Sequence, residues 1–478
     1  MRRGLAILLA GFAAAAAERP VELNPQNPHY FQYRGRTTPL ITSGEHYGAV
    51  LNADFDYRRY LDTLRSDGMN YTRIFGGSYV EVPAKSFGIL RNTLAPARNR
   101  FLPPWARSGV KFDLNRWNPD YFARLHDFLA EASKRGIVVE LTLFSSQYGD
   151  AQWGVSALNP VNNVNGTDNI DRKKLNTLEN GNILGYQERY VRKLVREVNR
   201  HPNVIFEIAN EPWTDRPVHA DVMNPDLPLP QRNRFPNAVE IPDELAMRWQ
   251  ERVAGWIGME ESSLPNKHLI AQNIANFRHR VRSLIPGVSV VNFHYARPEA
   301  VSENYGLNKV ISYDESGFLG RGDDVYTSEA WKFMLSGGGA FDGLDYSFSV
   351  GHEDGTDLEP NGPGGGSPEF RRRLRILSEF LRSFPLTEMA PDARTVKPAA
   401  GVEAYALSSA KGEYAIYLEG KNSGVVLNLP AGRYTVRWLD IESGKESPAT
   451  AFRQAGGEKT LAVPAFRKGI AARLERTR

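Results

Sequence analysis

The run of residues 204–213, Val-Ile-Phe-Glu-Ile-Ala-Asn-Glu-Pro-Trp, constrains the fold more than any other stretch of the chain. It begins as a short apolar segment rich in β-branched residues, which is typical of a buried strand. Pro212 has no backbone donor and restricts Glu211 to non-helical conformations, so we expect the strand to end there. A carboxylate at the carboxyl end of a buried strand lies where parallel β/α folds build their active sites. A glutamate in this place can also cap a loop or pair with an arginine.

Further apolar runs alternate with stretches of helical apolar spacing on both sides of this strand. We expect strands at 39–43, 69–75, 137–144, 204–210, 267–273, 288–293, 309–313 and 340–346, most of them followed by a helix. Such alternation predicts a parallel α/β architecture, and eight strands favour a closed (β/α)8 barrel over an open doubly wound sheet. The strands lack the glycine-rich phosphate-binding loops of nucleotide-binding folds, which argues against that alternative.

The pattern changes near residue 394, where helical spacing gives way to short alternating runs separated by turn residues. Tyr414 to Leu418 and Tyr434 to Leu439 are two of these runs. They predict a small all-β sandwich. Because 478 residues are too many for one compact core, we expect two domains, a barrel over 18–390 and a β-sandwich domain over 394–478.

The first 17 residues have the anatomy of a signal peptide. Arg2-Arg3 precede an apolar core from Leu5 to Phe12, and Ala15-Ala16-Ala17 offers a cleavage site of small residues. The apolar run is short for a bilayer, and no later stretch could span one, so we expect a secreted or periplasmic protein without a membrane span. The sequence does not indicate an oligomeric state.

Composition excludes some classes of function. The chain has no cysteine, which rules out disulfides, a thiolate nucleophile and cysteine metal ligands. The formal charge of +4 is spread along the chain without a basic block, so nucleic-acid binding has little support.

A second glutamate, Glu315 in Asp314-Glu315-Ser316-Gly317, follows the seventh expected strand. Together with Glu211 after the fourth strand, it gives two carboxylates at the ends of different strands, which suggests glycoside hydrolysis. That reaction needs one carboxyl to protonate the leaving oxygen and another to attack the sugar carbon or activate water. A separation of about 5–5.5 Å between them gives retention of configuration, and about 6.5–9.5 Å gives inversion.

On these residues the chain resembles a clan A glycoside hydrolase, close to the family five cellulase-like group. The resemblance covers roughly residues 30–385 and rests on Asn210-Glu211-Pro212, Glu315, Arg73 at the end of the second strand and His294-Tyr295 at the end of the sixth. It implies a TIM barrel in which Glu211 is the acid/base and Glu315 the nucleophile. The C-terminal part resembles a small β-domain, labelled collagen-binding-like, that follows many secreted glycosidases.

The resemblance also implies roles for the supporting residues. Arg73 would keep the nucleophile ionised, because a nearby cation lowers the pKa of a carboxylate; a structural salt bridge is the alternative. Asn210 would bind the sugar 2-hydroxyl. His294 and Tyr295 resemble a pair whose tyrosine binds the nucleophile. Since adjacent strand residues face opposite sides, we expect only one of the two to reach the pocket, and a core histidine is an open alternative.

Three further residues lie at expected strand ends or in the loops that follow them. Glu45, Trp153 and Tyr346 are candidates for shaping the sugar-binding subsites, and each also has a structural explanation. Long segments at 78–112, 145–180 and 214–240 could close a pocket for an exo-acting enzyme or form the walls of a cleft for an endo-acting one.

The sequence thus predicts a secreted, retaining glycoside hydrolase that cleaves a β-linked oligo- or polysaccharide by double displacement. A non-catalytic carbohydrate-binding or matrix-adhesion protein on a barrel scaffold is the alternative. We expect no cofactor and no catalytic metal, because no His/Asp cluster has the spacing of a metallohydrolase. The sugar and its linkage stay open.

Overall fold

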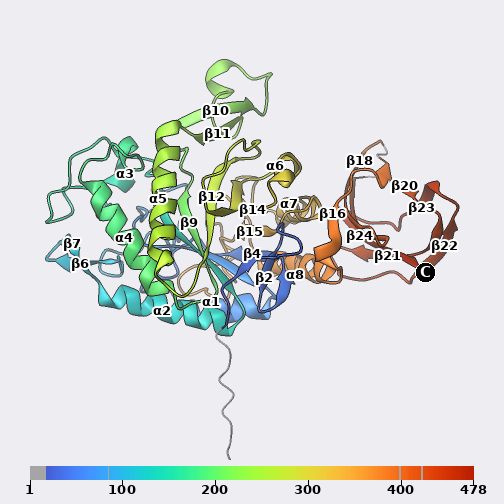
Figure 1. Ribbon diagram of the computed structural model, residues 1–478, viewed down its shortest axis with the longest axis horizontal. Coiled ribbons are helices and arrows are strands. Elements are labelled where there is room, and N and C mark those ends of the chain that lie inside the picture. Colours follow the sequence, from blue (N-terminus) through green and yellow to red (C-terminus); the bar gives the residue numbers. More distant parts are fainter. Residues whose placement is uncertain (1–17, 84–85, 398–399, 421–423, 478) are drawn as a thin grey trace, which may run out of the picture.

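The computed structural model describes residues 18–83, 86–397, 400–420 and 424–477, so the expected signal peptide at 1–17 lies outside the described residues. A large barrel is followed by a smaller β-domain at one side of it (Figure 1). Among the helices of the described residues, none combines the length and apolar character needed to cross a bilayer.

Eight parallel strands form the barrel, as the sequence predicts. They are β4 (Leu40–Gly44), β5 (Tyr71–Phe75), β8 (Val138–Ser145), β9 (Val204–Asn210), β12 (Leu269–Asn276), β13 (Val288–His294), β14 (Val310–Glu315) and β15 (Ala340–Leu344). Their order is β4-β15-β14-β13-β12-β9-β8-β5. The two end strands meet through Asn70, whose side chain accepts from the Ile41 amide at 2.8 Å and donates to the Pro39 carbonyl at 2.9 Å.

Helices surround the strands and bury one apolar face each against them. They are α1 (Tyr57–Ser66), α2 (Pro119–Lys134), α4 (Ile183–Val198), α5 (Glu244–Ser262), α6 (Pro298–Asn304), α7 (Asp323–Leu335) and α8 (Pro368–Arg382). Local sequence sets several of their starts. Asn118 caps α2 and Ser367 caps α8, and each is followed by a proline at the first helical position, where a missing backbone donor costs nothing.

The amino end of the barrel is closed. A small antiparallel sheet of β1 (Glu22–Leu23), β2 (Phe31–Tyr33) and β3 (Arg36–Thr38) supplies Phe31 and Tyr33. These rings pack with apolar residues near the starts of all eight barrel strands. The carboxyl ends of the strands, where barrels of this type carry their active sites, are not covered by this sheet.

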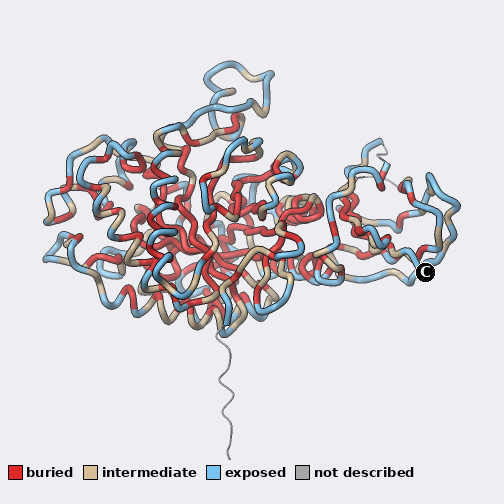
Figure 2. The backbone as a smooth tube through the Cα atoms, viewed as in Figure 1, coloured by how far each residue is buried: buried red, intermediate tan, exposed pale blue. Residues whose placement is uncertain are grey.

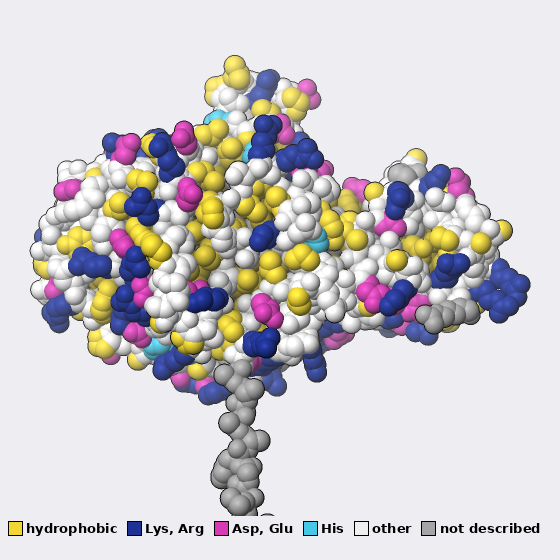
Figure 3. All heavy atoms as spheres, in the orientation of Figure 1, with side chains coloured by type: hydrophobic (Ala, Val, Ile, Leu, Met, Phe, Trp, Pro, Cys, Tyr) yellow, Lys and Arg dark blue, Asp and Glu magenta, His cyan; other side chains and the backbone are white. Residues whose placement is uncertain are grey.

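Shorter elements decorate the loops at the open end. They are the hairpin β6 (Trp105–Ser108) and β7 (Lys111–Trp117), the short helix α3 (Asp150–Trp153), the hairpin β10 (Pro217–Val222) and β11 (Ala238–Pro242), and the 3-10 turns η1 (Arg172–Lys174) and η2 (Leu229–Gln231). A further 3-10 turn, η3 (Tyr305–Leu307), follows α6 and leads into the amino end of β14, where Tyr305 stacks on His29. The β10–β11 hairpin projects from the barrel (Figure 1). Over the barrel face seen in Figure 3, acidic and basic side chains are interspersed.

The C-terminal domain is a two-sheet β-structure, as the sequence predicts, entered through the turn η4 (Leu386–Glu388). One sheet contains β16 (Met389–Pro391), β18 (Val402–Ser409), β19 (Glu413–Gly420), β24 (Gly469–Thr477), β21 (Gly432–Asp440) and β22 (Thr450–Gln454). The other contains β17 (Val396–Lys397), β20 (Gly424–Leu429) and β23 (Gly457–Ala462). The apolar faces of the two sheets meet in a core separate from that of the barrel (Figure 2).

The larger sheet also packs against the barrel. The Trp331 ring of α7 stacks on Tyr417 of β19 with 5.4 Å between ring centroids. Lys332 forms ion pairs with Glu403 at 2.7 Å and Glu419 at 3.2 Å. Since Trp331 is fully buried, the two domains share a continuous apolar interface.

Candidate active site

A pocket lies at the carboxyl ends of the barrel strands. Three carboxylates line it, Glu81, Glu211 and Glu315, together with Asn210 and His46. The remaining lining side chains are aromatic or aliphatic: Tyr47, Phe75, Tyr79, Phe87, Leu94, Tyr148, Tyr295, Phe318, Leu344 and Tyr346. Aromatic walls with a few fixed polar groups suit a ligand that carries both C–H faces and hydroxyl groups.

Glu315 is the last residue of β14 and is held by three donors. The Tyr47 hydroxyl donates to Oε2 at 2.9 Å, and the Tyr295 hydroxyl donates to Oε1 at 2.8 Å. The Arg73 guanidinium approaches Oε2 at 3.3 Å. Three donors on two oxygens fix the orientation of the Glu315 carboxyl group.

Glu211 directly follows β9 and has φ +42°, a left-handed conformation that is uncommon for a residue with a side chain. Its backbone N–H donates to Asn273 at 3.0 Å, which helps to hold this turn. Its carboxylate accepts from Tyr148 at 2.9 Å, contacts His294 Nδ1 at 3.0 Å and accepts from Tyr295 at 3.3 Å. Backbone strain of this kind is common where function fixes a side chain.

The two glutamates face one another. An oxygen of Glu211, an oxygen of Glu315 and a ring nitrogen of His294 all lie within 4.8 Å of one another. The Tyr295 hydroxyl contacts both carboxylates. The fold therefore brings together two acids that are far apart in the sequence.

Glu211 and His294 shift each other's pKa in opposite directions. Burial alone would raise the pKa of Glu211, but the hydrogen bond and positive charge of His294 outweigh it and hold the pKa below its usual range. Burial alone would lower the pKa of His294, but the charges of Glu315 and Asp314 raise it well above its ordinary value. The pair thus holds one proton, on the ring, next to the Glu211 carboxylate.

Arg73 is fully buried beneath the pocket, and its main partner is Glu207 of β9. Its Nε and Nη2 donate to the two Glu207 oxygens at 2.8 and 2.7 Å, and Nη2 also donates to Asn210 Oδ1 at 2.7 Å. It reaches Glu315 with Nη1. Both sequence interpretations of Arg73 therefore describe it in part, because it makes a structural ion pair and contacts the expected nucleophile.

His294 and Tyr295 both reach the site, which differs from the expectation that only one would. The alternation of side chains ends at His294, the last residue of β13. Tyr295 has φ +51° and its N–H donates to the Glu315 carbonyl at 2.8 Å, so the backbone turns and directs both side chains toward the carboxylates. The alternation of side chains along a strand therefore does not extend to Tyr295, which follows the end of β13.

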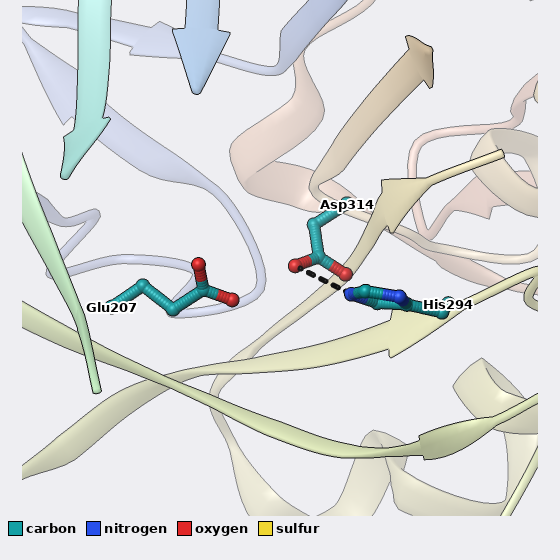
Figure 4. A group of neighbouring side chains, drawn as sticks. All are labelled: Glu207, His294 and Asp314. Atoms are coloured by element: carbon teal, nitrogen blue, oxygen red, sulfur yellow. Dashed lines mark ion pairs between the residues drawn. The ribbon is translucent and has the colours of Figure 1, made fainter. Parts of the chain in front are cut away.

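Two groups of side chains here have ligand atoms close enough to hold a metal ion, Glu207–His294–Asp314 and Glu211–His294–Glu315. Figure 4 shows the first group, with the Asp314 carboxylate paired to the His294 ring. The Arg73 guanidinium already lies on Glu207 and 3.6 Å from Asp314. A protonated His294 cannot coordinate a metal, so these residues fit a proton and a guanidinium better than a metal ion.

The three peripheral candidates lie in different environments. Tyr346 lines the pocket, with its ring 6.0 Å from that of His46. Glu45 is turned into its own loop, where it accepts from the Gly48 and Ala49 amides at 3.0 Å. Trp153 belongs to α3 and packs at the edge of the barrel core, outside the pocket lining. The structure thus brings Tyr346 to the site and leaves Glu45 and Trp153 beside it.

Several site residues escaped the sequence interpretation. Tyr47 donates to Glu315 and Tyr148 donates to Glu211. Glu81 also lines the pocket. Tyr148 lies in the aromatic and amide-rich segment 145–180, and Tyr47 follows the end of the first barrel strand. The sequence indicates such residues only by their position near the ends of expected strands. Many residues that do not line the pocket share that position.

Comparison with known proteins agrees with this architecture. No protein-family model and no curated protein sequence matches the chain. A solved glycoside hydrolase aligns over 96% of this chain and 97% of its own with a TM-score of 0.62 and 12% identity. A family 5 glycoside hydrolase of Bacteroides vulgatus aligns over 95% and 93% with a TM-score of 0.61 and 11% identity. A further protein of that bacterium aligns over 97% and 84% with a TM-score of 0.65 and 14% identity. The chain therefore shares the fold of solved glycoside hydrolases along almost its whole length.

Proposed function

We propose that this protein is a retaining glycoside hydrolase that cleaves an O-glycosidic bond of a β-linked glycan by double displacement. The observation that carries the proposal is the approach of Glu211 and Glu315, which have oxygens within 4.8 Å of each other. One hydroxyl, that of Tyr295, reaches both carboxylates, at 3.3 and 2.8 Å. Such close carboxylates fit the short separation of about 5–5.5 Å typical of retaining enzymes, and not the larger gap that admits a water molecule. The fold shared with solved glycoside hydrolases adds support.

In the first step Glu315 attacks the anomeric carbon and forms a glycosyl–enzyme ester. Glu211 gives a proton to the departing glycosidic oxygen, so the leaving group departs as an alcohol. That proton comes from the Glu211–His294 pair, whose atoms are 3.0 Å apart. In the second step Glu211 takes a proton from water, the hydroxide attacks the anomeric carbon, and Glu315 leaves as a carboxylate.

The surrounding side chains have matching roles. Tyr47 and Tyr295 orient the two oxygens of Glu315 before attack. Asn210 is fixed by Arg73 on Oδ1 and donates from Nδ2 to Tyr148 at 2.5 Å, which positions its amide at the pocket wall to bind the 2-hydroxyl group. Contacts to that hydroxyl strengthen in the transition state and lower the barrier.

The proposal includes export, because the first 17 residues have the charge, apolar core and small-residue end of a signal peptide. Expression of the full chain in a bacterial host tests this directly. A mature N-terminus near residue 18 in the periplasm or medium is expected, and an intact, cell-associated Met1 terminus would contradict it.

A panel of 4-nitrophenyl β-glycosides and polysaccharides tests the activity. Glu211→Ala and Glu315→Ala should each reduce turnover to near background while the circular dichroism spectrum is unchanged. Glu353→Ala is the matched control, because this buried glutamate accepts from backbone amides of Asp56 and Gly351 in the loops around α1 and β15 and contributes nothing to the pocket lining.

NMR of the first-formed sugar tests the stereochemistry. Retention predicts that a β-glycoside releases the β-anomer first, before mutarotation. Release of the α-anomer would overturn double displacement, and substantial turnover by Glu315→Ala would remove it from the role of nucleophile. Sugar binding without release of any product would favour the non-catalytic alternative.

A further inference from the structure

One end of the pocket is closed by residues 86–94, which we call the strap. The strap belongs to the long segment after β5 and is bound to the loop after β15. The Leu90 N–H donates to the Asn361 carbonyl at 2.8 Å, and the Arg91 N–H donates to the Asn361 side chain at 2.6 Å. The Arg91 guanidinium also pairs with Asp357, with Nη2 at 2.9 Å from Oδ1. The strap therefore joins loops from the two strands that flank β4.

The strap also packs on the turn after β4. A side chain at Gly48 would collide with the Thr93 backbone, which shows how closely the two segments approach. Asn52 donates to the Thr93 carbonyl at 3.0 Å, and Thr93 donates to the His46 carbonyl at 3.1 Å. Phe87 and Leu94 of the strap line the pocket. On this side the strap forms an end wall.

A carboxylate with no place in the catalytic steps lies at this wall. Glu81 lines the pocket, is only 4% exposed and is held by the strap through a hydrogen bond from Asn92 to Oε2. His46 Nε2 contacts the same oxygen at 3.3 Å. Among the described residues, Oε1 has one long contact, 3.4 Å from the Tyr79 hydroxyl. A carboxylate oxygen can accept two hydrogen bonds, so Oε1 has capacity for a ligand.

The wall lies on the side of the expected nucleophile. A chain of contacts links Glu81 to Glu315. The His46 ring contacts Glu81 and stacks on Tyr47 with 5.2 Å between centroids, and the Tyr47 hydroxyl donates to Glu315. The sugar that becomes bonded to the nucleophile is the glycon. The closed end, with Glu81, therefore faces the glycon and not the leaving group.

We infer that the enzyme is exo-acting: the pocket takes the terminal sugar at the non-reducing end of a chain, and Glu81 accepts hydrogen bonds from its free hydroxyl groups. This inference rests on the proposed function. An internal sugar would need a channel for the next residue where the strap and Glu81 stand. A carboxylate held by His46 and Asn92 is pre-oriented to accept from hydroxyl donors, and such charge-assisted bonds are stronger than neutral ones. Glu81 acts as a specificity residue and takes no part in bond cleavage.

Product analysis tests the mode of action without any variant. Using oligosaccharides of the preferred sugar labelled at the reducing end, we expect release of single sugars and labelled products shortened by one unit at a time. The same chains capped by O-methylation of the terminal sugar should be cleaved far more slowly. Internal cleavage, or equal rates on capped and free chains, would overturn the inference while leaving glycoside hydrolysis intact.

Glu81→Gln tests the contact with the sugar. On the preferred 4-nitrophenyl glycoside, the loss of a charge-assisted acceptor should lower kcat/KM roughly 10- to 100-fold. On the monodeoxy glycosides that lack a contacted hydroxyl, the variant and the wild type should have nearly equal kcat/KM. Glu353→Gln, the matched control, should leave kcat/KM unchanged across the series.

The outcomes separate the two proposals. An equal loss on every deoxy glycoside would mean that Glu81 only supports the wall, and it would overturn the contact. The absence of hydrolysis of any glycoside by the wild-type protein would overturn the proposed function, and the inference would fall with it.

Discussion

Replacing His294 by asparagine separates the charge of this residue from its hydrogen bond. An asparagine amide can stand close to the position of Nδ1 and can still donate to Glu211, but it cannot hold a proton. In the wild type the pair keeps one proton up to the raised pKa of His294, and in the proposed mechanism the carboxylate passes that proton to the leaving oxygen. kcat/KM should therefore fall as the pH rises through that raised pKa, and in His294→Asn it should fall at a lower pH.

The size of the pH shift expected for His294→Asn follows from the contact between His294 and Glu211. His294 Nδ1 lies 3.0 Å from Glu211, with Asp314 and Glu315 at 3.5 and 3.6 Å from the ring nitrogens. A hydrogen bond to a charged group contributes about 1.5–3 kcal/mol. Since one pKa unit corresponds to about 1.36 kcal/mol, the basic limb should move about 1–2 pH units toward acid.

Initial rates on the preferred 4-nitrophenyl glycoside between pH 4 and about 10 give the basic limb of the kcat/KM profile. The absorbance at each pH is corrected for the ionisation of the released 4-nitrophenol. The control is His268→Asn, because His268 is another buried histidine paired with a glutamate, 2.6 Å from Glu261. His268 directly precedes β12, at the amino end of the barrel and away from the pocket. An unmoved basic limb in His294→Asn, or an equal shift in the control, would refute the shared-proton account.

The same histidine predicts a pH dependence of stability. Its folded pKa lies above the ordinary value of 6.5, so the folded state binds the proton more tightly than the unfolded state does. The stability that it contributes is fully present below the unfolded pKa and is lost as the pH rises through the folded pKa. Urea midpoints of the wild type should fall across that window, and His294→Asn should flatten this part of the curve.

The remaining predictions concern the oriented nucleophile, a loop and the domain interface. Tyr47→Phe and Tyr295→Phe each remove one hydroxyl donor from Glu315 and should lower kcat/KM roughly 10- to 100-fold, with Tyr295→Phe the larger loss because its hydroxyl also contacts the second carboxylate. Glu45→Ala leaves two backbone amides of its turn unpaired and should cost about 1–3 kcal/mol in urea unfolding, with kcat/KM retained well below the transition. Trp331→Ala empties a fully buried site at the domain interface and should cost about 3–5 kcal/mol, and a smaller loss would mean that the domains fold independently there.

The sequence predicted the features that local patterns encode. Buried parallel strands appear as apolar runs, many of them rich in β-branched residues, and each of the eight barrel strands overlaps a run that the sequence marks as a strand. Glu211 and Glu315 are predicted as site residues because they stand where two of these runs end. Both assignments depend only on neighbouring residues.

Pairing across the barrel could not be predicted in this way. Glu207 lies inside the apolar run of β9, where the surrounding residues indicate only a core strand. Its partner Arg73 is 134 positions earlier, and the two meet only when the barrel closes. Loops set a second limit on prediction. Glu45 and Trp153 are near strand ends, but their direction is set by turns such as the one that binds Glu45 to Gly48.

The buried polar interior beneath the pocket explains why the site needs these unpredicted partners. Glu140, Glu207, Asp314 and Asp342 all lie inside the barrel with at most 1% exposure. Burial raises the pKa of Glu140 and, by a wide margin, that of Asp342, which favours their neutral forms. Asp314 differs, because His294 and Arg73 outweigh burial and lower its pKa.

Glu207 and Asp314 are the acids that lie against the two buried cations; burial raises the pKa of Glu207, and the charge and hydrogen bonds of Arg73 oppose that rise. Glu207 pairs with Arg73 through two hydrogen bonds, and Asp314 lies against the His294 ring. Buried charges are tolerated only when they are paired and hydrogen-bonded, and here the pairing places one cation under Glu315 and the other beside Glu211. The interior acids therefore position a cation beside each of the two pocket glutamates, and a chain with the same pocket glutamates but an apolar barrel interior would lack those cations.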